Sequence, residues 1–392
     1  MSAPPPPGAV VPAAQARLVL HVIPTAAARG AQREARALAT RLDVPGSRHH
    51  RLLSLFAGPA QIPVDFALDH HGGDTPAVGF DPRLALRLRA VVRRTDPVVV
   101  IAHGGDPLKY LVPAVLGTAR PLAYYATGTF EHAAHPGRVA LWRALVRRAD
   151  VVAAEGDEVL EQCRRLLRVP EERSVLAPNG RDPTEFHPGD PPAPGPVPVV
   201  AFVGALTEGK RPQRFVEVVA SLRRRGVALR ALACGDGPLG PSLVGPAADA
   251  GVELLGTRSD VAEVLRGTDV FVFPSLPTGE GMPGVLIEAG LTGLPVVATD
   301  VPGVRSVVDD GITGFVVGVD DLDAMVEATS RLLSGPSLRH AMGGAARRRC
   351  LERFSLDAVA ACWLSFLDPL FSRAVRTRRA RSAPNTRRAP EA

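Results

Sequence analysis

The sequence predicts an α/β protein with two Rossmann-like domains, each built on a parallel β-sheet whose faces are covered by helices. Short apolar runs rich in β-branched residues alternate with amphipathic segments along most of the 392 residues. That alternation is typical of strands buried on both faces. A proline-rich stretch near the middle interrupts it. At about 100–200 residues per domain, the length also suits two domains.

The first predicted domain spans residues 17–185 and follows a proline-rich N-terminus, 1–16, that we expect to be disordered. Its first strand, 17–23 (RLVLHVI), leads into an amphipathic helix at 30–42, and the run PVVVIA at 97–102 is apolar throughout. The other expected strands are 51–56, 122–126, 150–154 and 174–177, and the other expected helices are 84–94, 138–148 and 157–167.

Residues 186–198 (FHPGDPPAPGPVP) contain six prolines, which neither a central strand nor a helix tolerates. We interpret them as the linker to a second domain, 199–354, where the alternation restarts. An apolar helix, 355–372, and an arginine-rich tail, 373–392, that reads as disordered complete the chain. The strands expected in the second domain are 199–203, 228–234, 252–255, 270–273 and 296–298, and the helices are 212–225, a segment ending at 250, 260–266 and one starting at 283.

Composition and charge exclude several classes of protein. The tail carries seven arginines and one acid, so it accounts for the whole formal net charge of +6. A protein whose folded domains bind nucleic acid would carry its excess of basic residues on those domains. We therefore expect no nucleic acid partner. The tail offers at most peripheral contact with an anionic membrane. Four scattered cysteines without a CxxC pair indicate reduced thiols. We find no signal peptide and no 18-residue apolar run, and we expect a cytoplasmic protein.

The segment Gly235–Gly240 formally matches G-x-G-x-x-G after a strand. A dinucleotide site is disfavoured here, because Pro238 lies inside the motif and no acid stands about 20 residues further on. The motif also follows the second strand of its domain instead of the first. A tight turn that lets the backbone approach a ligand is the better interpretation.

The segment FPSLPTGEGMPGVLIEA, 273–289, carries the strongest functional signal. A strand ends at Phe273, and glycines around the start of the next helix leave backbone N–H groups open to an anion such as a diphosphate. Glu280 and Glu288 lie eight residues apart, where two carboxylates can accept hydrogen bonds from the hydroxyls of one elongated ligand. Two unrelated surface glutamates are the plain alternative.

The third motif, 202–210 (FVGALTEGK), is the loop after the first strand of the second domain. It ends in Lys210, one of only two lysines among 46 basic residues. Its compact ammonium suits a phosphate group, although a solvated lysine at a helix start would look the same.

Together with Asn179-Gly180 and the segment 293–314, these motifs resemble the family 4 glycosyltransferases of the GT-B fold, most specifically in E-x7-E. The resemblance covers about residues 17–371 and implies that two domains face a cleft, with the acceptor on the first and a nucleotide diphosphate sugar on the second. It implies that Lys210 holds the diphosphate, Glu288 the ribose and Glu280, as a catalytic residue, the sugar. Further donor contacts follow from the resemblance at Gly30, Gly204, Gly235, Gly237, Arg258, Gly281 and Met282.

This chain departs from the family pattern at two positions. Ala205 stands where the first-loop arginine is usual, so Arg211 or Arg214 would have to replace that cation. Thr127 stands where similar sequences have a histidine. His103, at the end of the strand PVVVIA, is our candidate catalytic residue that faces the sugar, although a histidine that only lines a pocket or is structural would look the same. His132 and His135 are weaker candidates.

The resemblance implies transfer with retention of anomeric configuration, and it implies neither a cofactor nor a metal ion. The C-terminal helix is expected to pack back on the first domain, with Trp363 and Phe366 in the core. The acceptor stays open among a lipid, a polysaccharide and a natural product. Two alternatives also stay open: a GT-B sugar-nucleotide epimerase and a non-catalytic partner that binds a sugar nucleotide.

Overall fold

A computed structural model of the chain describes residues 17–27, 30–71, 79–128, 130, 136–189, 197–277 and 281–382, with side chains up to residue 377. The proline-rich segment 1–16 and the end of the basic tail, 383–392, therefore lie outside the described residues. The chain divides into two compact units. The first is formed by residues 1–125, 144–152 and 364–392, and the second by residues 126–143 and 153–363.

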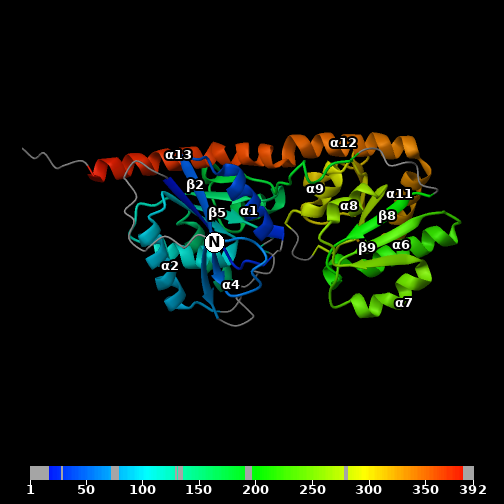
Figure 1. The fold of residues 1–392 in the computed structure, drawn as a ribbon, viewed down its shortest axis with the longest axis horizontal. Helices are drawn as coiled ribbons and strands as arrows, with labels where there is room; N and C mark the ends of the chain where they lie inside the picture. Colours follow the sequence, from blue (N-terminus) through cyan, green and yellow to red (C-terminus); the bar gives the residue numbers. More distant parts are fainter. Residues whose placement is uncertain are drawn as a thin grey trace, which may run out of the picture. The chain divides into compact units, whose positions relative to one another are not determined.

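Seven strands form the first sheet, in the order β3-β2-β1-β4-β5-β6-β7 (Figure 1). The neighbouring pairs from β3 to β5 are parallel, and β4 and β5 are buried along their whole length. The strands are β1 (Arg17–Ile23), β2 (Arg48–Phe56), β3 (Phe66–His70), β4 (Val99–His103), β5 (Leu122–Ala126), β6 (Val151–Ala154) and β7 (Ser174–Leu176).

Helices connect these parallel strands, and the first of them turns one apolar stripe inward. In α1 (Gly30–Leu42) the buried stripe includes Ala35, Leu38 and Leu42, at the three- and four-residue spacing of an amphipathic helix. The Asp81 side chain caps α2 by accepting a hydrogen bond from the backbone N–H of Arg83. The helices after α1 are α2 (Pro82–Thr95), α3 (Gly105–Val115), α4 (Pro136–Val146) and α5 (Asp157–Arg165).

The second sheet has six parallel strands in the order β10-β9-β8-β11-β12-β13. One apolar core includes Phe215, Leu243 and Met325 from α6, α7 and α11. The other includes Leu265, Leu286 and Phe354 from α8, α9 and α12. The sheet is therefore covered on both faces, as a buried parallel sheet requires. The strands are β8 (Val199–Val203), β9 (Arg230–Cys234), β10 (Val252–Gly256), β11 (Val270–Phe273), β12 (Val296–Thr299) and β13 (Gly314–Val317). The helices are α6 (Pro212–Arg224), α7 (Gly240–Ala250), α8 (Val261–Arg266), α9 (Gly284–Leu291), α10 (Val304–Val307), α11 (Leu322–Ser334) and α12 (Pro336–Phe354).

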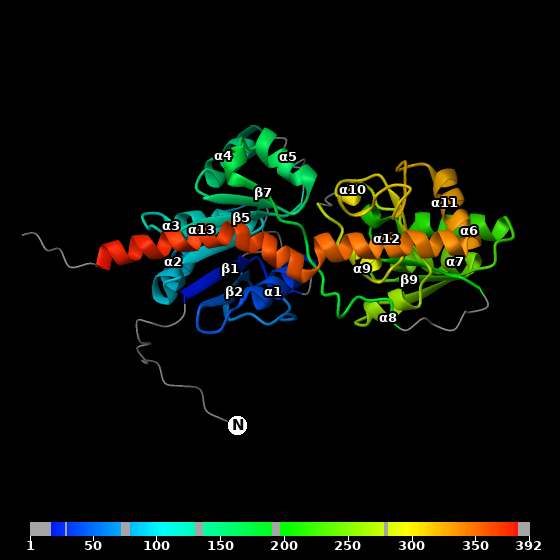
Figure 2. The ribbon, with the colours of Figure 1, turned by 90° about the horizontal axis from the view of Figure 1, so that it is seen from above.

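The last helix, α13 (Leu356–Ser382), extends ten residues beyond the expected end at 372. From residue 364 onward it belongs to the first unit and crosses the strands of the first sheet (Figure 2). The guanidinium groups of Arg17 and Arg48 stack on the ring of Phe371, and Arg48 also pairs with Asp368. These contacts and the ion pair of Arg373 with Asp150 explain why the segment after 372 begins as a helix and not as the disordered tail we expected.

By length and composition, residues 356–377 of α13 could also cross a membrane, contrary to the expectation of no such segment. However, Trp363 and Phe366 are only 1% and 7% exposed, and Leu367 and Phe371 are buried as well. Those burials are what a core helix of a globular unit shows.

Three further differences from the expected organisation concern the elements, the start of the linker and the domain boundary. The strands β3 and β13 and the helices α3, α10, α11 and α12 were not predicted. Phe186, expected as the first linker residue, is buried in the core beside α8 and α9, and residues 190–196 lie outside the described part. Residues 153–185, assigned to the first domain, contribute β7 to the first sheet, but they also pack with the second unit. Polar contacts such as Asp157 with Ser306 and Asn179 with the Met282 carbonyl hold them there.

Alanine substitutions at two adjacent glycines of α12 should change the free energy of unfolding in opposite directions, which tests this packing. A Cβ at Gly343 would lie 2.1 Å from the Gly293 carbonyl oxygen, whereas a Cβ at Gly344 would meet only the flexible end of Arg348, at 3.6 Å. We expect Gly343→Ala to lower the free energy of unfolding by about 1–3 kcal/mol through overpacking. Gly344→Ala should raise it by about 0.5–1 kcal/mol, since alanine favours the helix. Denaturant unfolding of both variants measures this, and equal shifts would contradict the packing described.

Candidate functional site

The strand order places two of the sequence motifs at one point of the second sheet. The chain proceeds from β8 outward to β9 and β10, and then returns to β11 on the other side of β8. Ligands of such sheets bind beyond the carboxyl ends of the strands where the order reverses. The loop 204–210 leaves β8 there, and the loop 274–283 leaves β11. They are joined by a hydrogen bond from the Leu276 N–H to the Gly209 carbonyl, at 2.7 Å.

Glycines let the loops after β8 and β9 lie backbone against backbone. Gly235 has a φ of +141°, and a Cβ there would stand 1.9 Å from the Gly204 carbonyl oxygen. A Cβ at Gly237 would stand 2.6 Å from the Leu206 carbonyl oxygen. The Leu206 N–H also donates to the Asp236 carbonyl at 2.9 Å. The G-x-G segment is thus a close backbone turn, as the sequence indicated.

Lys210 ends the loop after β8 in a single 3-10 turn, Glu208–Lys210. Its ammonium lies 5.3 Å from the centre of the Phe273 ring, at the end of β11. Burial lowers the pKa of Lys210 to about 8, because desolvation disfavours the charged form. A cation held at such a position gains from an incoming anion.

The loop before α9 is packed as tightly as the loop after β9. A Cβ at Gly303 would stand 2.1 Å from the Gly281 carbonyl oxygen, and one at Gly281 would stand 1.7 Å from the buried carboxylate of Glu155. The Met282 side chain is in the apolar core, so only its backbone remains to contact a sugar donor. Glu280 lies outside the described residues, as do His132 and His135.

Glu288, in the second turn of α9, makes an ion pair that the sequence analysis did not foresee. Its Oε1 accepts a hydrogen bond from Nε of Arg181 at 2.7 Å, and the two side chains are 17% and 16% exposed. The only signal in the sequence was the position of Arg181 directly after Asn179-Gly180.

Other predicted cations are engaged elsewhere. Arg258 lies in the loop after β10 and pairs with Asp260 through two nitrogens, at 2.7 and 2.5 Å. That loop adjoins the glycine turn, since the Gly235 N–H donates to the Gly256 carbonyl. Arg211 donates to the Val319 carbonyl and pairs with Asp320, and Arg214 pairs with Glu217. These contacts give neither arginine the role expected of a cation that replaces the one missing at Ala205.

In the first unit, His103 ends β4 as part of a buried row of three histidines. His21 on β1 bonds His103 through Nδ1 and His50 on β2 through Nε2, both at 2.8 Å. His103, His21 and His50 are 4%, 0% and 2% exposed. Gly30 begins α1 at an exposed position, and a Cβ there would meet nothing within 4 Å.

Burial keeps the imidazoles of this row neutral. It lowers the pKa of His103 to about 3 and of His50 to about 4, and it lowers the pKa of His21 well below the usual 6.5. Desolvation is the largest cause at each histidine, and the neighbouring imidazoles oppose a charge on His21 as well. His103 is therefore a neutral hydrogen-bonding group at the end of β4.

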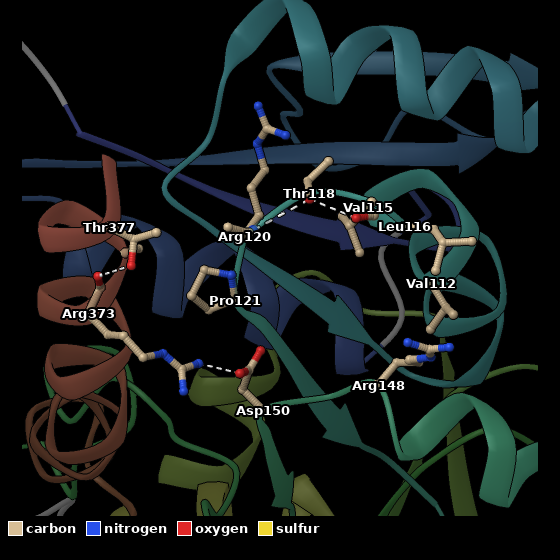
Figure 3. Close-up of a pocket in the computed structure, with 13 residues that line it drawn as sticks. Val112, Val115, Leu116, Thr118, Arg120, Pro121, Arg148, Asp150, Arg373 and Thr377 are labelled. Carbon is tan, nitrogen blue, oxygen red and sulfur yellow. Dashed lines mark hydrogen bonds and ion pairs between the residues drawn. The ribbon is translucent and has the colours of Figure 1, made fainter. Parts of the chain in front are cut away.

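A cavity of about 370 Å³ lies in the first unit, at the amino ends of β5 and β6 (Figure 3). Arg120, Arg148 and Arg373 line it. Arg373 pairs with Asp150 across its floor, and Arg120 pairs with Asp96. The cavity lies at the amino ends of its strands, whereas His103 stands at the carboxyl end of β4, and the cavity forms no part of the candidate site. Among the described residues, no three His, Cys, Asp or Glu side chains are grouped to hold a metal ion.

Comparisons with known proteins identify the family to which the chain belongs. Residues 28–185 match the family model "Glycosyltransferase Family 4", and residues 197–335 match "Glycosyl transferases group 1". The alpha-D-kanosaminyltransferase of Streptomyces kanamyceticus is 30% identical over 305 residues, which cover 70% of this chain and 78% of that protein. The chain belongs to the family 4 glycosyltransferases. The match confirms the resemblance seen in the E-x7-E segment and favours a transferase over the epimerase.

Other relatives agree with this assignment. The alpha-maltose-1-phosphate synthase of Mycolicibacterium smegmatis is 30% identical over 64% of this chain and 72% of that protein. The D-inositol 3-phosphate glycosyltransferase of Nocardia farcinica is 34% identical, but the match covers 51% of this chain and about half, 49%, of that protein.

Solved structures confirm the GT-B fold. Sucrose-phosphate synthase of Thermosynechococcus elongatus matches with a TM-score of 0.77 at 18% identity, over 91% of this chain and 100% of that one. Anabaena HepE in complex with UDP matches with a TM-score of 0.74 at 17% identity, over 90% of this chain and 100% of that one.

The histidine row makes stability depend on pH. Below about 6.5 the unfolded chain binds protons that the folded imidazoles refuse, so the free energy of unfolding falls as the pH falls. The expected slope between pH 6.5 and 5 is at most about 1.4 kcal/mol per pH unit for each histidine. The three histidines contribute together to this slope of the free energy of unfolding against pH, and His50→Asn should remove about a third of their contribution. Denaturant unfolding at pH 7, 6 and 5 measures it.

Val99→Ala is the matched control for this experiment, because it removes buried volume from β4 but no imidazole. It should lower stability equally at each pH. A His50→Asn curve parallel to the wild-type curve would contradict the buried neutral row.

Proposed function

We propose that this glycosyltransferase takes a sugar from a nucleoside diphosphate sugar bound at the carboxyl edge of the second sheet, and that it transfers the sugar with retention. The observation that supports the proposal is that Lys210 and α9, the helix that carries Glu288, follow the neighbouring strands β8 and β11 at the point where the strand order reverses. Crystals of the structural relative HepE contain UDP, which supports a nucleotide donor in this fold.

The arrangement suits departure of a diphosphate. As the bond from the anomeric carbon to the phosphate oxygen breaks, negative charge grows on the leaving group. The first N–H groups of α9, from Gly284 and Val285, have no partner within the helix and lie at its positive end. With the Lys210 ammonium they would stabilise that charge. The acceptor hydroxyl oxygen then bonds to the same carbon, and its proton leaves with the diphosphate or to water.

The acceptor is proposed to be a hydroxyl group of a lipid, a polysaccharide or a natural product. The names of the relatives cover an inositol phosphate, an aminosugar donor and a maltose phosphate product, and acceptor specificity lies in loops that differ among such enzymes. His103, neutral and at the end of β4, is proposed to hydrogen-bond a sugar.

Calorimetric titration with UDP, GDP and ADP tests the donor site. We expect one of the three to bind, and Glu288→Ala to weaken that binding by about 10- to 100-fold, because hydrogen bonds to a charged group contribute about 1.5–3 kcal/mol. Gly344→Ala is the control, because Gly344 lies in α12 and not in the loops or the helix α9 of the candidate site. Unchanged affinity in Glu288→Ala would refute the assignment of the ribose to this carboxylate.

The lowered pKa of Lys210 predicts how binding depends on pH. The charged ammonium attracts the diphosphate, so affinity should be constant below about pH 8 and fall up to tenfold per pH unit above it, until the neutral amine is reached. Lys210→Arg should remove the fall, because guanidinium stays charged. Titrations from pH 6.5 to 9.5 measure this. A wild-type affinity that is flat to pH 9.5 would show that Lys210 does not contact the diphosphate.

A further inference from the structure

We propose that Arg181 is a positioning residue for nucleotide recognition: it fixes the carboxylate of Glu288 so that one oxygen is held by the protein and the other is presented to the ribose. The inference rests on the proposed function. It adds a residue outside the E-x7-E segment, and it assigns different roles to the two oxygens of Glu288.

The backbone of Arg181 is anchored on both sides to the junction of α12 and α13. Its N–H donates to the Phe354 carbonyl at 2.9 Å, and its carbonyl accepts from the Leu356 N–H at 3.0 Å. A bridge to Ser355 completes this short parallel pairing. Arg181 therefore starts from a fixed position, unlike an arginine on a surface loop.

The guanidinium is held along the first turn of α9. Nη1 donates to the Gly180 carbonyl at 2.8 Å, and Nε donates to Oε1 of Glu288 at 2.7 Å. A Cβ at Gly284 would stand 1.9 Å from Nη2, so any other residue at 284 would displace the guanidinium. Gly284 and Glu288 are four residues apart on one face of the helix, and the arginine covers that face.

The ion pair leaves the carboxylate asymmetric. Oε1 is occupied by Arg181, whereas no hydrogen bond to Oε2 is formed within the described part of the chain. The Glu288 side chain remains 17% exposed, so a ligand can reach it. With one oxygen fixed, the carboxylate no longer rotates freely, and its second oxygen has a defined direction before a nucleotide arrives. Such preorganisation lowers the entropy cost of binding.

An arginine next to the start of α9 could instead attract the diphosphate directly. The geometry favours the positioning role, because Nε and Nη1 both donate to protein acceptors and the guanidinium lies against Glu288. The two roles differ in one measurable respect. Positioning of Glu288 affects recognition of the ribose hydroxyls, while attraction of the diphosphate affects ribo- and deoxyribonucleotides equally.

The experiment compares UDP with 2′-deoxy-UDP, and GDP with 2′-deoxy-GDP, by calorimetric titration of the full chain. A carboxylate built to accept a hydroxyl proton rejects the analogue that lacks it, so the wild type should prefer the ribonucleotide by about 10- to 100-fold. Arg181→Met keeps the aliphatic stem but not the hydrogen bond, and should reduce the preference to below about threefold. Arg181→Gln, which can still donate to Oε1, should restore part of it.

Two further variants separate the explanations. Glu288→Ala should lose the preference as fully as Arg181→Met. Arg339→Met is the matched control: Arg339 is similarly buried, at 19% exposed, pairs with Asp269 and donates to the Leu332 and Leu333 carbonyls. It should change stability but not the preference for ribose.

Each outcome decides the inference. If Arg181→Met weakens both nucleotides equally, or keeps the wild-type preference while Glu288→Ala loses it, the positioning role is wrong and the proposed donor site stands. If the wild type binds a diphosphate without preferring ribose, both the role of Arg181 and the assignment of Glu288 to ribose fail. If no nucleoside diphosphate binds, the proposed function fails and this inference fails with it.

Discussion

The close approach of backbone to backbone at the carboxyl edge of the second sheet is the constraint on which the candidate site depends. Gly235 and Gly237 bring the loop after β9 against the loop after β8, and Gly303 does the same for the loop before α9. At each contact a Cβ would overlap a carbonyl oxygen. These contacts hold the loop that ends in Lys210 and the loop that precedes α9, the helix that carries Glu288.

The two units bury ionisable groups in different ways. In the first, His21, His50 and His103 bond imidazole to imidazole, and burial keeps them neutral. In the second, Glu288 is paired with Arg181, and the desolvated ammonium of Lys210 gains from an anionic ligand. A neutral hydrogen-bonding surface suits an uncharged sugar, whereas a preorganised set of charges suits a nucleoside diphosphate.

Much of the fold could be predicted from sequence because buried parallel strands are nearly continuous apolar runs. β1, β5, β8 and β11 have the expected bounds. β3 was missed because Asp69 and the exposed Ala67 break the apolar pattern of this short edge strand. α3 was missed as well, and its prolines Pro107 and Pro113 weaken the local signal for a helix. The helical start of the tail depends on contacts of Arg373 with a residue 223 positions away, which no local pattern reports.

The candidate site, too, could be predicted from sequence only in part. Lys210 and the glycine turn could be proposed from sequence because they lie in loops that follow predicted strands, and Glu288 because it lies in the helix after such a loop, where ligands of such sheets bind. The pairing of Arg181 with Glu288 joins residues 107 positions apart, and the histidine row joins three strands, so neither leaves a periodic signal. Three-dimensional packing alone brings these groups together.

The course of α13 has a consequence for how the protein is made. The first unit takes its last helical segment from residues after 364, so the ribosome must pass that point before the first sheet receives Leu367, Leu370 and Phe371. Domains usually fold as they emerge, the N-terminal one first. Here the N-terminal unit must wait with an uncovered apolar face while the second is synthesised. A nascent chain stalled before residue 364 would therefore expose that face to chaperones and to aggregation.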